Sequence, residues 1–165
     1  MELTTPEGDD HMRSVCASCG TIFYCNPKLV VGIVATNGHR VLLCKRAIEP
    51  IGKWTIPAGY MENEETVMEG AKREAREEAN ADVKLGNILA CYSIKQISQV
   101  QIIFSGELVN AEEVNAGQET LEVKLFEWDE IPWEELAYPT VHWALKRRKE
   151  TMGKPDCAPE LKIKA

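Results

Sequence analysis

The chain lacks a long apolar run, an excess of basic residues and a recognisable N-terminal targeting segment. No apolar stretch approaches the ~20 residues that a membrane-spanning helix needs, so we expect none. Acidic residues outnumber basic residues by 26 to 19, giving a net charge of −7. This balance argues against a protein that holds nucleic acid through a broad basic surface. The first ten residues are acidic and polar, unlike a signal or transit peptide, so we expect a cytoplasmic protein.

A disulfide framework is also not expected, although the chain has six cysteines. Without a secretory signal, a reducing environment is the default, and thiols stay free there. Cys44 and Cys91 lie in apolar stretches and are predicted to pack as small core residues. Cys16 and Cys19 form a Cys-x-x-Cys motif in a short segment rich in Cys, Gly and Pro.

The composition predicts one folded α/β domain. The 165 residues suit a single core, and 44% of them are hydrophobic. Apolar and β-branched runs predict strands at 29–35, 40–45, 53–57, 88–97, 100–109 and 121–128, and helices at 66–79 and 139–151. We expect a loose arm at 1–15, and we divide the chain into an N-terminal segment 1–27, a main domain 28–152 and a tail 153–165.

Acidic residues are concentrated in two segments. Residues 59–80 hold seven acids and three bases, and residues 107–135 hold ten acids and one base. The remainder therefore carries +6, with a basic patch at 146–149. Such segments are usually solvated surface. The alternative is that the two acidic segments converge on a bound cation.

The predicted helix at 66–79 favours the cation. Glu74, Glu77 and Glu78 fall within about 100° on one side of the helix, beside its apolar stripe. Carboxylates near a core are costly unless they are paired or bind a metal. Oxygen ligands in this number suit Mg²⁺ or Mn²⁺. The alternative is a surface helix in which Arg73 pairs with glutamates one turn away.

The spacing around this helix resembles a known signature. Gly59, five residues, Glu65, seven residues and then Arg73-Glu74-Ala75-Arg76-Glu77-Glu78 resembles the Nudix box of hydrolases that act on nucleoside diphosphates linked to another moiety. The preceding Trp54-Thr55-Ile56-Pro57-Ala58 belongs to the match. Where the family usually has Gly, this chain has Asn80, which also tolerates the left-handed backbone of a helix end.

The resemblance implies an α/β/α sandwich with a mixed sheet and a metal-dependent site. Glu74 and Glu78 would bind Mg²⁺ or Mn²⁺, with Glu77 as a further ligand or a base for water. The backbone carbonyl of Ala58 would complete the site. Glu65 and Arg73 would orient the loop and the helix through an ion pair.

The second acidic segment offers a further base or ligand. Relatives of this kind often use a glutamate near this point, and Glu119 and Glu122 are the two candidates. On the substrate side, we expect contacts from Arg46, Trp54, Gly59 and Tyr60. The aromatic residues Trp54, Tyr60, Phe104 and Tyr138 are candidates for stacking on a base, although each also suits a core.

The N-terminal motif Cys16-Ala-Ser-Cys19-Gly20 resembles half of a zinc ribbon. Structural zinc needs four ligands, and the second cysteine pair of such a ribbon is absent. His11 and Cys25 are alternative ligands at non-standard spacing. A degenerate ribbon that only packs is the other interpretation.

The resemblance extends over about residues 13–148, to a Nudix subgroup that includes ADP-ribose and FAD pyrophosphatases. It implies hydrolysis of ADP-ribose or FAD to two monophosphates. The alternatives are a nucleotide-sensing module without catalysis, or an enzyme for nucleoside triphosphates, NADH or CoA derivatives. The family often forms a homodimer, and 97–104 is a candidate contact. The Cys motif and the basic patch at 146–149 are the argument for a nucleic-acid-binding protein. The alternative is that the patch is the last turn of a helix, where positive charge is favourable.

Overall fold

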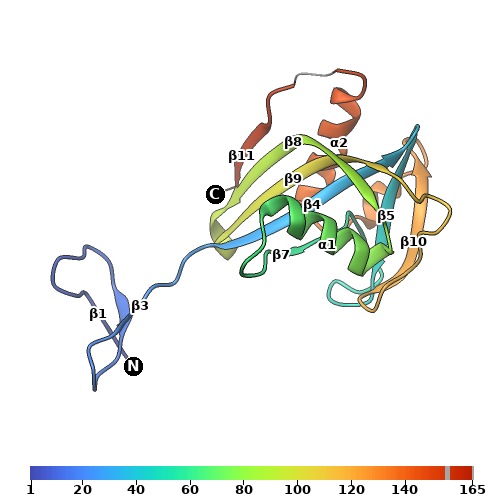
Figure 1. Ribbon diagram of the computed structural model, residues 1–165. Coiled ribbons are helices and arrows are strands. Elements are labelled where there is room, and N and C mark those ends of the chain that lie inside the picture. The colour runs from blue at the N-terminus through green and yellow to red at the C-terminus, as the bar shows by residue number, and fades with distance from the viewer. Residues whose placement is uncertain (155–156, 165) are drawn as a thin grey trace.

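The computed structural model describes residues 1–154 and 157–164, which form a small N-terminal sheet and a larger α/β body (Figure 1). The elements are β1 (Glu2–Thr4), β2 (Arg13–Val15), β3 (Ile22–Phe23), β4 (Lys28–Asn37), β5 (Arg40–Arg46), β6 (Trp54–Thr55), β7 (Ala58–Tyr60), α1 (Val67–Ala79), β8 (Val83–Ile94), the 3₁₀ turn η1 (Lys95–Ile97), β9 (Gln99–Leu108), β10 (Thr120–Glu127), the 3₁₀ turn η2 (Trp133–Glu135), α2 (Pro139–Thr151) and β11 (Glu160–Lys164).

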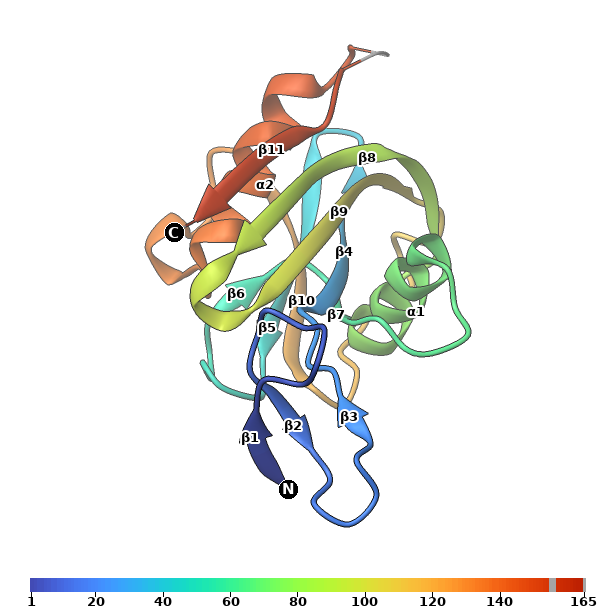
Figure 2. The same ribbon diagram turned by 90° about the vertical axis from the view of Figure 1, so that its left-hand side faces the viewer.

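The body is a mixed sheet between two helices. Its main path runs β10-β5-β4-β9-β8-β11, with β9 parallel to β4 and β11 parallel to β8. Figure 2 shows α1 and α2 on opposite faces of this sheet. One apolar cluster includes Leu145 of α2, and a second includes Ala71 and Ala75 of α1. The predicted α/β/α arrangement is confirmed.

The sheet is split where the site forms. Strands β4 and β5 pair with each other next to the Asn37-Gly38 turn, at Thr36 with Val41 and at Asn37 with Arg40. Farther along, β4 pairs with β7 and β5 pairs with β6. The segment 54–60 therefore fills the gap between two diverging strands. Its backbone lies directly beside α1, which contacts β7.

Helix α1 begins and ends as its sequence predicts. Thr66 caps the N-terminus in a reciprocal capping box with Glu69. Asn80 ends the helix with φ 48°, the left-handed conformation that Asn tolerates better than most residues. The apolar positions 71, 75 and 79 are buried, so the helix docks along its alanine stripe. This docking turns the adjacent glutamates toward the gap in the sheet.

Two segments are more ordered than expected. The arm at 1–15 contains β1 and β2, which pair with each other and then with β3 in a separate three-stranded sheet. The tail at 153–165 contributes β11, which extends the main sheet at its edge. The strands β1, β2 and β11 are short. They form through pairing with neighbouring strands, which a local pattern does not specify. Among the described residues, neither helix has the length and apolar character needed to cross a membrane.

Candidate functional site

A cavity of about 1120 Å³ opens at the split in the sheet. It brings together residues from both acidic segments, as the charge distribution predicts. The expected site residues that line it are Arg46, Ala58, Gly59, Tyr60, Arg73, Glu74, Glu77, Glu78 and Glu119.

Two glutamates of α1 line this cavity: Glu74 is 8% exposed, and Glu78 is partly buried. Burial chiefly, together with the charges of Glu74 and Glu119, raises the pKa of Glu78 to about 8, although the hydrogen bond from the Ala58 N–H and the charge of Arg46 oppose this shift. Burial also raises the pKa of Glu74, although Arg73 opposes this effect. The pair is therefore held in a place where its ionised form needs an additional positive charge.

The backbone of 58–59 is shaped around these carboxylates. The N–H of Ala58 donates a hydrogen bond to Glu78 Oε2 at 3.2 Å. A Cβ added at Gly59 would lie 2.4 Å from the carboxylate carbon of Glu74, so any larger residue here would displace this carboxylate from its present position. The spacing from Gly59 to Glu74 thus has a direct steric meaning in this fold.

Arg73 ties the loop to the helix. Its guanidinium donates to both carboxylate oxygens of Glu65, at 2.8 and 3.0 Å, and to the carbonyl of Tyr60 at 3.0 Å. It also donates to Glu74 at 2.7 Å and to Glu77 at 3.0 Å. Hydrogen bonds from Arg73 are the largest cause that lowers the pKa of Glu65 to about 2. The expected Glu65–Arg73 ion pair is present.

Of the two candidates in the second acidic segment, Glu119 lines the cavity and Glu122 does not. Glu122 lies opposite Lys45 in the β10–β5 register and forms an ion pair with it at 3.8 Å. An irregularity between Thr120 and Glu122 interrupts the strand pairing at this point. The expectation that Glu122 binds metal or acts as a base is therefore not supported by its position.

Glu119 reaches the site because its loop is docked on the end of α1. The N–H of Gly117 donates to the Glu78 carbonyl at 3.1 Å, and a Cβ on Gly117 would lie 1.7 Å from the Glu77 carbonyl oxygen. The Asn80 side chain donates to the Glu113 carbonyl at 3.2 Å. The residue that departs from the usual glycine therefore also anchors this loop.

The aromatic candidates divide into core and cavity residues. Trp54 is 5% exposed and packs edge-on against Phe126, and Phe104 is 3% exposed. Trp54 is therefore a core residue, which corrects its expected role in substrate binding. Tyr60 and Tyr138 line the cavity, and the guanidinium of Arg46 lies 5.3 Å from the centre of the Tyr138 ring.

A group of glutamines in the cavity wall was not anticipated. Gln96, Gln99, Gln101 and Gln118 all line the cavity. Gln99 and Gln101 alternate with apolar residues along β9, so their side chains point to one face of the sheet. This alternation of amides within the otherwise apolar segment 99–104 is the signal in the sequence that would have indicated them.

The N-terminal thiols do not complete a zinc site within the described residues. Cys16 and Cys19 lie in the β2–β3 turn, and hydrogen bonds, chiefly from Ser18, lower the pKa of Cys16 to about 6. His11 lies in the β1–β2 connection, at the other end of β2, and Cys25 follows β3. The turn thus supplies two of the four ligands that structural zinc takes.

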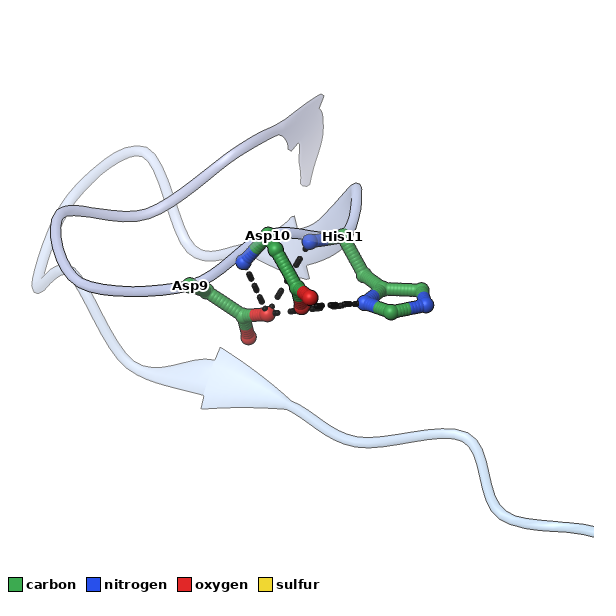
Figure 3. A group of neighbouring side chains, drawn as sticks. All are labelled: Asp9, Asp10 and His11. Atoms are coloured by element: carbon green, nitrogen blue, oxygen red, sulfur yellow. Dashed lines mark hydrogen bonds and ion pairs between the residues drawn. The ribbon is translucent and has the colours of Figure 1, made fainter.

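Within the described ranges, one group of three His, Cys, Asp or Glu side chains has ligand atoms that all lie within 4.8 Å of one another. It consists of Asp9, Asp10 and His11 (Figure 3). They are consecutive residues of an exposed loop. Asp9 is already paired with Arg13 at 2.8 Å. The group is therefore explained by local hydrogen bonding.

Comparison with known proteins agrees with this geometry. The family model described as NUDIX domain matches residues 26–145, and the model described as Nudix N-terminal, a zinc-ribbon model, matches residues 1–25. A crystal structure of a NUDIX hydrolase from Nitrosomonas europaea is 46% identical, with a TM-score of 0.93, over 99% of this chain and 93% of that one.

Curated relatives are more distant. An ADP-ribose pyrophosphatase of Methanocaldococcus jannaschii is 28% identical over 66% of this chain and 67% of its own length. The mitochondrial NAD(P)H pyrophosphatase NUDT13 of Homo sapiens is 30% identical over 82% of this chain, which spans only 37% of that protein. The family model covers most of the body, including the helix whose glutamates lie at the split in the sheet, and the chain belongs to the Nudix hydrolase family.

Proposed function

We propose that this protein hydrolyses the pyrophosphate bond of ADP-ribose, or of FAD as the second candidate, to two monophosphates. The observation that carries the proposal is the pair of glutamates, Glu74 (buried) and Glu78 (partly buried), in the wall of a cavity of about 1120 Å³. A cavity of this size accepts a dinucleotide-like ligand. The relative from M. jannaschii named ADP-ribose pyrophosphatase supports ADP-ribose as the first substrate to test.

The donor set fits Mg²⁺ or Mn²⁺. Glu74 and Glu78 would hold the metal, with the Ala58 carbonyl and Glu77 as further oxygen ligands, because hard divalent cations prefer such groups. Their environment supports this assignment, since burial raises the pKa of both Glu74 and Glu78 and leaves their ionised forms in need of positive charge. When bound, such a metal neutralises phosphate charge and lowers the pKa of a coordinated water.

The chain's own side chains have separate proposed roles around this metal. Glu119 is the proposed base, because it lies in the cavity on a loop docked against α1, and Glu77 is the rival. Arg46 is the proposed phosphate contact, since it lines the cavity and its charge acts on Glu78. Arg73 would position the loop and the helix through its five hydrogen bonds.

A substrate panel with product identification tests the proposal. Wild type with Mg²⁺ or Mn²⁺ is expected to convert ADP-ribose to AMP and ribose 5-phosphate, measured by mass spectrometry. FAD, NADH, CoA and nucleoside triphosphates complete the panel. Glu78→Gln is expected to lower kcat at least 100-fold, because neutralising a metal ligand removes transition-state stabilisation. Equal hydrolysis by wild type and Glu78→Gln across the panel would contradict the proposal.

A further inference from the structure

The floor of the cavity beyond the glutamates is a regular piece of sheet. Ile103 of β9 pairs with Gly32 of β4, which pairs with Ala58 of β7, the residue that contacts Glu78. The next row outward joins Gln101, Val30 and Tyr60 across the same three strands. Two residues along a strand span about 7 Å, so the second row lies about 7 Å from the row that contacts Glu78, roughly the length of a sugar ring.

The polar side chains of this floor form one hydrogen-bonded chain. Gln101 Nε2 donates to Gln99 Oε1 at 3.2 Å, and Gln99 Nε2 donates to Tyr60 Oη at 3.1 Å. With the amide orientations of this structure, the two ends of the chain have different chemistry. Gln101 retains an oxygen that accepts, and Tyr60 retains a hydroxyl hydrogen that donates.

The residues of β8, η1 and β9 that line this wall are uncharged: Ile94, Gln96, Ile97, Gln99, Gln101 and Ile103. On the neighbouring strand β4, the ammonium of Lys28 lies 4.9 Å from the centre of the Tyr60 ring. Amides with adjacent aliphatic side chains suit a flat, neutral group that hydrogen-bonds at its edge. The opposite end of the cavity differs, since Arg46 lies against Tyr138 there and suits a phosphate.

We propose that Tyr60, Gln99 and Gln101 form the nucleobase subsite and that they select adenine. The Gln101 oxygen would accept from the adenine amino group, and the Tyr60 hydroxyl would donate to a ring nitrogen. Glutamine recognises adenine in nucleic acids through the same two kinds of hydrogen bond. Hypoxanthine carries an oxygen in place of that amino group, which would face the Gln101 oxygen. The inference rests on the proposed function, because it assigns the nucleotide half of the proposed substrate to this end.

Product binding tests the subsite without turnover. Isothermal titration with AMP, IMP and ribose 5-phosphate, in the presence of Mg²⁺, is expected to show wild type binding AMP about tenfold more tightly than IMP, the effect of one lost hydrogen bond. Gln101→Met keeps the volume and removes the acceptor. It is expected to abolish the preference for AMP and to leave the affinity for ribose 5-phosphate unchanged.

Ser105→Ala is the matched control, because Ser105 lies on the same strand β9 but does not line the cavity, and it is expected to keep the AMP preference. The inference is overturned if Gln101→Met keeps the preference, if it weakens ribose 5-phosphate equally, or if Ser105→Ala also removes the preference. A parallel assay of ADP-ribose hydrolysis by wild type separates the two proposals. Hydrolysis with an unchanged preference in Gln101→Met refutes the subsite alone, whereas a Gln101-dependent preference without hydrolysis of any substrate refutes the catalytic function alone.

Discussion

Glu78 gives the metal-free protein a pH dependence with a definite sign. Burial, and next to it the charges of Glu74 and Glu119, raises the pKa of its carboxyl from 4.5 to about 8. Between these two values the folded state holds one proton more than the unfolded state. The free energy of unfolding therefore falls as pH rises from about 4.5 to about 8, and stays lower above that.

The magnitude follows from the pKa difference. At about 1.4 kcal/mol per pKa unit, ionised Glu78 destabilises the metal-free protein by about 3 to 5 kcal/mol at pH 9. Glu78→Gln keeps the shape of the protonated side chain and removes this cost. For a chain of this length we expect the melting temperature of Glu78→Gln to exceed that of wild type at pH 9 by roughly 6 to 20 °C, with little difference at pH 5.

Thermal unfolding in EDTA at pH 5, 7 and 9 measures this effect. Glu77→Gln is the matched control, because Glu77 lies on the same helix with its side chain 59% exposed. It is expected to follow the wild-type profile. Mg²⁺ should raise the wild-type melting temperature at pH 9 and leave that of Glu78→Gln nearly unchanged. Parallel pH profiles for wild type and Glu78→Gln in EDTA would refute the reasoning.

Three further substitutions test how the site is held together. Arg73→Lys cannot reproduce the forked contact with Glu65 and the bond to the Tyr60 carbonyl, so we expect kcat to fall at least tenfold and the melting temperature to drop, measured by steady-state kinetics and calorimetry. Asn80→Gly keeps the left-handed backbone but loses the hydrogen bond to the Glu113 carbonyl. We expect kcat for ADP-ribose to fall several-fold with KM unchanged, and backbone hydrogen exchange to increase in 110–119. Gly117→Ala places a Cβ against a helix carbonyl and should lower kcat far more than Asn80→Gly, whereas equal effects of the two would argue against loop docking.

Local features of the sequence determined the helix and its chemistry. Thr66 and Glu69 supply the capping box, and Asn80 supplies the left-handed end, so α1 forms where the pattern predicts it. The spacing of Gly59 and Arg73 fixes which residues of the loop meet the helix. The glutamates beside the alanine stripe then had to approach the core wherever that stripe docked. These properties depend on neighbours within a few turns, which a single sequence displays directly.

Only the tertiary structure decided which of several similar residues enter the cavity. Glu119 and Glu122 are three residues apart, yet the strand register pairs Glu122 with Lys45 and the docked loop turns Glu119 inward. Trp54 is buried because it packs against Phe126 from a distant strand.

Tyr60 and Gln101 lie in one row across the sheet because β7 and β9 both pair with β4. The physical reason is the same in each case: cross-strand register and burial depend on contacts between segments far apart in the chain, and no local pattern specifies them. The sequence by itself determined that three glutamates of α1 gather beside its alanine stripe, and the pairing of distant strands decided the shape of the cavity around them.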